Sequence, residues 1–176
     1  MDVLVGPLRI VLPGAYLLTV LLYARLYRAE EEAGYLRQVR WSLGITLLLH
    51  MGLLVAIAGA NHRCPLGTQG EGLLFAAWIL CLLHVAAARV TGTQSLGFFT
   101  IAPATAGVCA ASFMYDQAFS LPEANQNSYF VFHIVASLTG YVCLCMAVVL
   151  ASSYIALHRR RDLPIKSSSG RTSGWP

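Results

Sequence analysis

Long apolar runs separated by short polar connections dominate this chain of 176 residues. The runs are Leu8–Tyr27, Trp41–Ala60, Gly72–Ala88, Leu96–Tyr115 and Ser128–Leu157. A helix rises 1.5 Å per residue, so about 20 mostly apolar residues cross the ~30 Å hydrocarbon core of a bilayer. The runs match or approach that length, and a soluble domain of this size could not hide them all in one core. The pattern predicts an all-α integral membrane protein with five transmembrane helices, and the short connections predict an antiparallel bundle.

Composition agrees with this fold class. Apolar residues make up 57% of the chain and charged residues 11%, whereas soluble domains average about 45–50% and about 25%. The sequence contains no serine–base pair, metalloprotease helix motif, phosphate-binding glycine loop or dinucleotide fingerprint. We therefore expect that the protein is not an enzyme by itself.

The 12 lysines and arginines are distributed unevenly. Ten lie at the end of the first run, between the first two runs, after the third run or after the fifth, and only Arg9 and Arg63 lie on the other side. Because basic residues are retained in cytoplasmic loops, this asymmetry predicts an N-out, C-in orientation. Topology and contact with anionic inner-leaflet lipid explain the net charge of +4, so we expect membrane lipid and no nucleic acid as a partner.

Two segments are expected along the chain. Residues 1–163 form the transmembrane domain, and residues 164–176, rich in Ser, Gly and Pro, form a disordered cytoplasmic tail. We expect a multi-pass protein of a bacterial-type plasma (inner) membrane.

Histidines inside apolar runs are candidates for function, because ionisable groups are costly in hydrocarbon. His50 lies near the middle of the second run and His84 toward the inner end of the third. For both, an interhelical hydrogen bond is the favoured interpretation. His133 lies five residues into the fifth run, on the same outer side as His62. Imidazole is a good axial ligand for haem iron, so these two histidines could reach one ligand.

Two helix faces could line such a ligand. Ser137 and Tyr141 follow His133 at four-residue steps and continue a polar stripe. Glu71 and Trp78 lie on one face of the third run, together with Phe75 and Leu82. An interfacial anchor is the ordinary explanation for Trp78, and a flat apolar ligand against this face is the alternative.

Several short motifs follow one another between about residues 40 and 165. They are His62-Arg-Cys-Pro-Leu66, Glu71-Gly-Leu-Leu-Phe-Ala-Ala-Trp78, Leu96-Gly-Phe-Phe-Thr-Ile-Ala-Pro103, the pair His133 and Tyr141, and the basic end His158-Arg-Arg-Arg-Asp-Leu163. Their order and spacing resemble the membrane cytochrome c assembly family, which includes CcsA-type and HemX-type proteins.

The resemblance implies haem delivery to apocytochrome c at the outer membrane face, with haem as the cofactor. His133 matches an outward haem-ligating histidine of the CcsA branch, while His62 has one residue more before the proline than the family pattern. The resemblance therefore implies a haem site with His133 as the iron ligand, extended by His62, Tyr141, Ser137, Glu71 and Trp78.

The sequence also departs from the family. The Trp-rich outward segment of the CcsA branch is absent, as is the outward histidine that follows it. We expect either the amino-terminal part of a longer ancestral protein or a shorter member whose partner, another cytochrome c assembly membrane protein, supplies the rest. Such a chain could be a component of a haem-attachment complex but would not attach haem alone.

The sequence thus favours a cytochrome c biogenesis protein that binds or guides haem at the outer face. One alternative is a HemX-type accessory protein that regulates or stabilises a haem-pathway partner without binding haem. Another is a small transporter whose substrate path would depend on His50.

Overall fold

The computed structural model describes residues 2–28, 33–92, 94, 96–114 and 127–161. Five helices cover most of them: α1 (Asp2–Arg28), α2 (Ala33–Asn61), α3 (Gln69–Thr91), α4 (Gly97–Met114) and α5 (Ser128–Arg161). All five are long and apolar enough to cross a membrane. This confirms the predicted all-α, multi-pass membrane protein, whereas the predicted tail at 164–176 lies outside the described residues.

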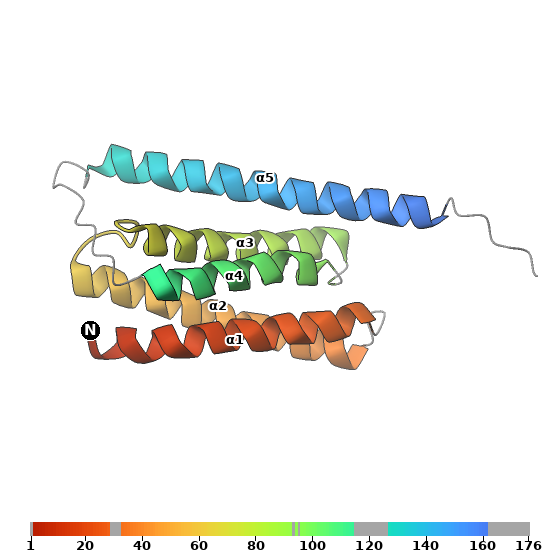
Figure 1. Cartoon of the computed structure of the whole chain (residues 1–176), viewed down its shortest axis with the longest axis horizontal. Coiled ribbons are helices and arrows are strands. Elements are labelled where there is room, and N and C mark those ends of the chain that lie inside the picture. Colours follow the sequence, from red (N-terminus) through yellow and green to blue (C-terminus); the bar gives the residue numbers. More distant parts are fainter. Residues whose placement is uncertain (1, 29–32, 93, 95, 115–126, 162–176) are drawn as a thin grey trace, which may run out of the picture.

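The helices pack in the order α2, α1, α4, α3, α5. α1 packs against α2 and α4, α4 packs against α3, and α5 packs mainly against α3. In contrast, α2 and α3 make few contacts with each other. Figure 1 shows α5 on the far side of α3, away from α1 and α2. We call α1–α4 the four-helix body.

Local sequence sets both ends of α3. The Thr68 hydroxyl accepts a hydrogen bond from the Glu71 N–H at 3.1 Å, and the Glu71 carboxylate accepts one from the Thr68 N–H at 3.2 Å. This capping box satisfies backbone donors that a helix start leaves unpaired. At the other end Gly92 has φ 74°, and its N–H donates to the Ala88 carbonyl. Glycine adopts this left-handed conformation without a steric cost, so the helix stops there.

Small residues bring α4 close to its neighbours. Gly97 lies directly under the ring of Tyr23, where any Cβ would collide with the aromatic carbons. Further along, the side of α4 that carries Gly107 lies close to Ala77 and the Leu73 carbonyl of α3. Close packing of small residues is a main source of helix association in membranes, because lipid tails are as apolar as the helices.

The largest fully buried side chains belong to the four-helix body. They are Tyr16, Tyr23, Leu12, Leu26, Leu53, Ile57, Ile101, His50, His84, Glu71, Val39 and Val108. Among the α5 residues with described side chains, only Val142 and Met146 are buried. α5 is therefore attached to the body by one narrow contact face.

Candidate functional site

The predicted polar stripe of α5 lies on a largely exposed side of the helix. His133 is exposed, Ser137 is half-buried, and Tyr141 is 69% exposed. A Cβ added at Gly140 would meet nothing within 4 Å, so no described helix approaches this position. The three side chains recur at four-residue steps and share one helix face.

His133 keeps its imidazole available. Within the part of the chain that the structure describes, no hydrogen bond or ion pair involves its side chain. Its neighbours Tyr129 and Phe132 are strongly exposed aromatic residues. The amino-terminal end of α5 thus presents a nitrogen donor beside exposed aromatic rings.

Glu71, unlike the exposed His133, has a buried side chain. Its side chain is 1% exposed and forms a two-point ion pair with Arg63, with Nη1–Oε2 at 2.7 Å and Nη2–Oε1 at 2.9 Å. The N–H groups of Gly67 and Thr68 also donate to Oε2, at 2.6 and 3.2 Å. A buried carboxylate needs such donors to offset its lost hydration. Glu71 therefore fixes the connection between α2 and α3 to the start of α3.

His62 and Trp78 lie on either side of this anchored connection. His62 directly follows α2, is exposed, and has φ 49°, a left-handed conformation that is uncommon for residues other than glycine. Trp78 is half-buried in α3, with its ring 6.3 Å from that of Phe75. The two aromatic residues that the spacing placed on one face of α3 are therefore neighbours.

The six predicted site residues fall into two groups. Figure 1 shows that α2 ends, and α3 and α5 begin, at one end of the molecule. No hydrogen bond or ring contact between described residues joins the α5 stripe to His62, Glu71 or Trp78. Their role in holding a cofactor therefore stays a prediction.

Cys64 lies in the connection after α2, between His62 and Glu71. It is a free cysteine, and partial burial, reinforced by the Glu71 carboxylate, raises the pKa of its thiol, while Arg63 acts in the opposite direction. A raised pKa keeps the thiol protonated and poorly nucleophilic near neutral pH. Cys64 is thus not an activated thiol.

A chain of buried polar contacts inside the four-helix body was not predicted as a unit. Near the middle of the four-helix body, the Tyr16 hydroxyl lies 2.7 Å from His50 Nδ1 and 3.5 Å from Cys81 Sγ. The other ring nitrogen, His50 Nε2, is buried beside the backbone of Leu74 and has no hydrogen-bond partner among the described residues. Tyr16 thereby connects three helices through one hydroxyl group.

A second contact of this kind lies near the other end of the body. The Tyr23 hydroxyl donates to Gln94 Oε1 at 3.1 Å and lies 2.9 Å from His84 Nε2. A hydroxyl has a single proton to donate, so it accepts from His84 Nε2–H. The favoured interpretation of His50 and His84 as partners in interhelical hydrogen bonds is confirmed.

Hydroxyl groups fill the space between these two tyrosines. Thr19 Oγ1 lies 2.7 Å from Ser42 Oγ and 2.9 Å from Thr46 Oγ1. The sequence contained a signal for this interior. Tyr16, Thr19 and Tyr23 are three and four residues apart, so they form a polar stripe on one face of an otherwise apolar helix.

Comparison with known proteins shows the family of the chain. Residues 67–174, more than half of the chain, match the family described as Cytochrome C assembly protein. The chain belongs to this family. The matched part includes Glu71, Trp78 and the His133, Ser137 and Tyr141 stripe, whereas His62 lies before it.

Individual relatives of the cytochrome c assembly family agree with the resemblance to CcsA-type proteins. Cytochrome c biogenesis protein CcsA of Crocosphaera subtropica is 28% identical over 121 residues, which cover 63% of this chain and 34% of that protein. CcsA of Porphyra purpurea is 26% identical over 138 residues, which cover 74% of this chain and 43% of that protein. The matched part of the chain thus spans well under half the length of these relatives. No solved structure matches the chain.

Proposed function

We propose that this protein acts in cytochrome c biogenesis by binding or guiding haem at the outer face of the membrane. The observation that supports this most strongly is the exposed His133 imidazole, which has no hydrogen bond within the described residues. It also lies within the part of the chain that matches the cytochrome c assembly family. A histidine that only joined helices would be paired, as His50 and His84 are.

The residues around His133 suit a haem group. Haem iron accepts an imidazole nitrogen as an axial ligand, and the macrocycle needs flat apolar contact. In this proposal His133 holds the iron, and Phe132 and Tyr141 offer exposed aromatic surface. Ser137 adds a hydroxyl group beside the stripe, while Gly140 leaves the space next to Tyr141 open.

The group at the start of α3 has a supporting role in the proposal. Glu71 uses its oxygens on Arg63 and on two backbone N–H groups. It therefore acts as a positioning residue that fixes the connection carrying His62. Trp78 forms the neighbouring wall of α3.

The proposed orientation is an antiparallel bundle with the amino terminus outside and the carboxyl terminus inside. Arg25, Arg28, Arg40 and Arg89 all lie near one end of the molecule, where α1 and α3 finish and α2 begins (Figure 1). Retention of basic residues in the cytoplasm supports placing that end inside. His133 then lies near the outer surface of a plasma membrane.

The proposed activity requires other molecules. A single exposed imidazole would supply one ligand to haem iron. We propose that another cytochrome c assembly membrane protein completes the site and that apocytochrome c receives the haem. The chain itself is proposed to hold and position haem, not to catalyse its attachment.

The proposal is tested by the absorbance spectrum and haem content of protein purified in detergent from haem-replete cells. We expect a Soret band in the wild type and its loss in His133→Ala. His158→Ala is the matched control, because it removes another exposed histidine of α5, at the opposite end of the helix. A His133→Gly variant that regains the band with added imidazole would identify ligation as the cause.

Two results would contradict the proposal. Equal haem content in wild type and His133→Ala would remove His133 from the site. Wild-type protein without any Soret band would favour the accessory function, in which the chain acts on a partner without haem.

A further inference from the structure

A groove opens between α2 and α3 at the arginine-rich end of the molecule, opposite the proposed haem site. These two helices make few contacts with each other, and the space between them encloses a cavity of about 560 Å³. Its lining residues are Arg40, Leu43, Gly44, Leu47, Val85, Ala88, Arg89, Gly92 and Gln94.

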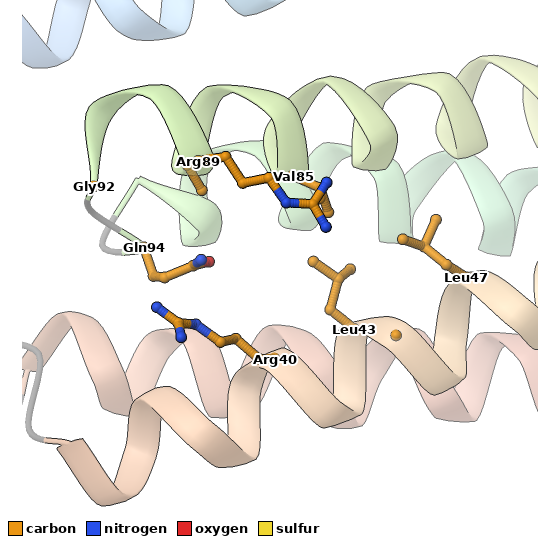
Figure 2. Close-up of a pocket in the computed structure, with 9 residues that line it drawn as sticks. Arg40, Leu43, Leu47, Val85, Arg89, Gly92 and Gln94 are labelled. Carbon is orange, nitrogen blue, oxygen red and sulfur yellow. The ribbon is translucent and has the colours of Figure 1, made fainter.

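Two cationic side chains line the groove. Figure 2 shows the side chains of Arg40 and Arg89, one from each helix, in the space between α2 and α3, with the Gln94 amide nearby. None of the nine lining residues is acidic. Two guanidinium groups on facing helices offer several N–H donors to one anion, and guanidinium matches the geometry of a phosphate group.

The rest of the groove lining is mostly apolar. Leu43 and Leu47 lie about one and two helical turns beyond Arg40, and Val85 lies one turn before Arg89. The groove therefore combines two cationic side chains with an aliphatic wall. A molecule that matches it has an anionic head and a long apolar body.

We propose that this groove binds an anionic phospholipid, with its phosphate between Arg40 and Arg89 and one acyl chain along Leu43, Leu47 and Val85. Basic pockets between transmembrane helices on the cytoplasmic side are characteristic sites for anionic lipid head groups. The inference rests on the proposed orientation, which places this end of the molecule inside, but it does not depend on haem binding at the opposite end.

Haem also combines carboxylate groups with an apolar body, but the groove fits a lipid better. Its nine lining residues include no aromatic ring, histidine, cysteine or methionine. The nearby His84 is buried, and its Nε2 is bonded to Tyr23. The lining thus offers contacts to an aliphatic chain and no ligand to an iron atom.

The test compares binding of phosphatidylglycerol and phosphatidylcholine, with identical acyl chains, to the detergent-purified protein by native mass spectrometry. We expect wild type to retain phosphatidylglycerol preferentially and Arg40→Gln/Arg89→Gln to weaken that binding about tenfold. The matched control is Arg25→Gln/Arg28→Gln, because these arginines are exposed near the same end but do not line the groove. The control loses the same charge and should stay within twofold of wild type.

A second variant fills the groove and keeps both arginines. A Cβ at Gly44 would meet nothing within 4 Å, so Gly44→Leu should fold and place its side chain in the cavity. We expect it to lose phosphatidylglycerol, whereas Gly52→Leu, at another open glycine of α2 outside the groove, should retain it.

Three outcomes would overturn the inference. Equal loss in the two double-arginine variants would mean diffuse attraction to the whole basic end. Equal binding of the two lipids would remove the anionic head group as the recognised feature. Displacement of the lipid by added haem, with haem binding lost in Arg40→Gln/Arg89→Gln, would assign the groove to haem carboxylates.

Discussion

The four-helix body and α5 use the same kinds of polar residue in opposite ways. In the body, His50, His84 and Tyr16 are buried and bonded to side chains of other helices. On α5, His133 and Tyr141 are exposed, and no hydrogen bond between described residues joins them to the body. A polar side chain in a membrane helix therefore has to be judged by its partners, because residue type alone does not separate structural from functional roles.

The difference has an energetic basis. Membrane helices gain little hydrophobic free energy from association, so close packing and interhelical hydrogen bonds carry much of the stability. The body contains both, whereas α5 packs mainly against α3 and buries few of its described side chains. We therefore expect substitutions in the body to change stability and substitutions on the exposed face of α5 to change binding.

The largest expected effect is at the ion pair of Arg63 and Glu71, in which the carboxylate is buried and Arg63 is 27% exposed. Arg63→Ala leaves the Glu71 carboxylate, which is 1% exposed, with only backbone donors. Removing one partner of a buried pair costs about 3 kcal/mol, whereas an exposed substitution such as His133→Ala should change stability by less than about 0.5 kcal/mol. The free energy of unfolding from SDS titration, followed by circular dichroism, measures both.

A double-mutant cycle tests whether Arg63 and Glu71 act as a pair. If the loss comes from an uncompensated charge, Arg63→Ala/Glu71→Ala should cost less than the sum of the two single substitutions. Strict additivity would mean that the two residues act independently, and the connection after α2 would then be held by other contacts.

Two glycines allow a second comparison of the body with α5. Gly97→Ala forces a methyl group into the ring of Tyr23, and overpacking of this kind costs about 1–3 kcal/mol. Gly140→Ala meets open space on α5, and alanine favours a helix over glycine by up to about 1 kcal/mol. Unfolding midpoints in detergent should therefore move in opposite directions, and a fall of similar size in both would show that the face of α5 at Gly140 is covered.

The sequence predicted the positions of the helices better than the side-chain contacts between them. Apolar run length depends on the chain alone, so all five helices were located, with α3 starting at Gln69 instead of Gly72 because the Thr68 capping box lies before the apolar run. The contact of Tyr23 with His84 joins positions 61 residues apart, and periodicity carries no information about such pairs. Similarly, the spacing that placed Glu71 on one face with Trp78 could not reveal Arg63 as its partner.

The smallest expected effect tests the hydrogen bonds themselves. Tyr16→Phe keeps the ring and removes the hydroxyl group that contacts His50 and Cys81, so it leaves the buried Nδ1 of His50 unpaired. Interhelical hydrogen bonds in membranes contribute about 0.6 kcal/mol on average and up to about 1.7 kcal/mol, and we expect a loss of about 1 kcal/mol. Tyr141→Phe removes the same group from an exposed position of α5 and should leave the free energy of unfolding unchanged. Equal effects at the two tyrosines would remove the distinction between a paired interior and an available surface, and the assignment of the α5 stripe to binding would lose its structural basis.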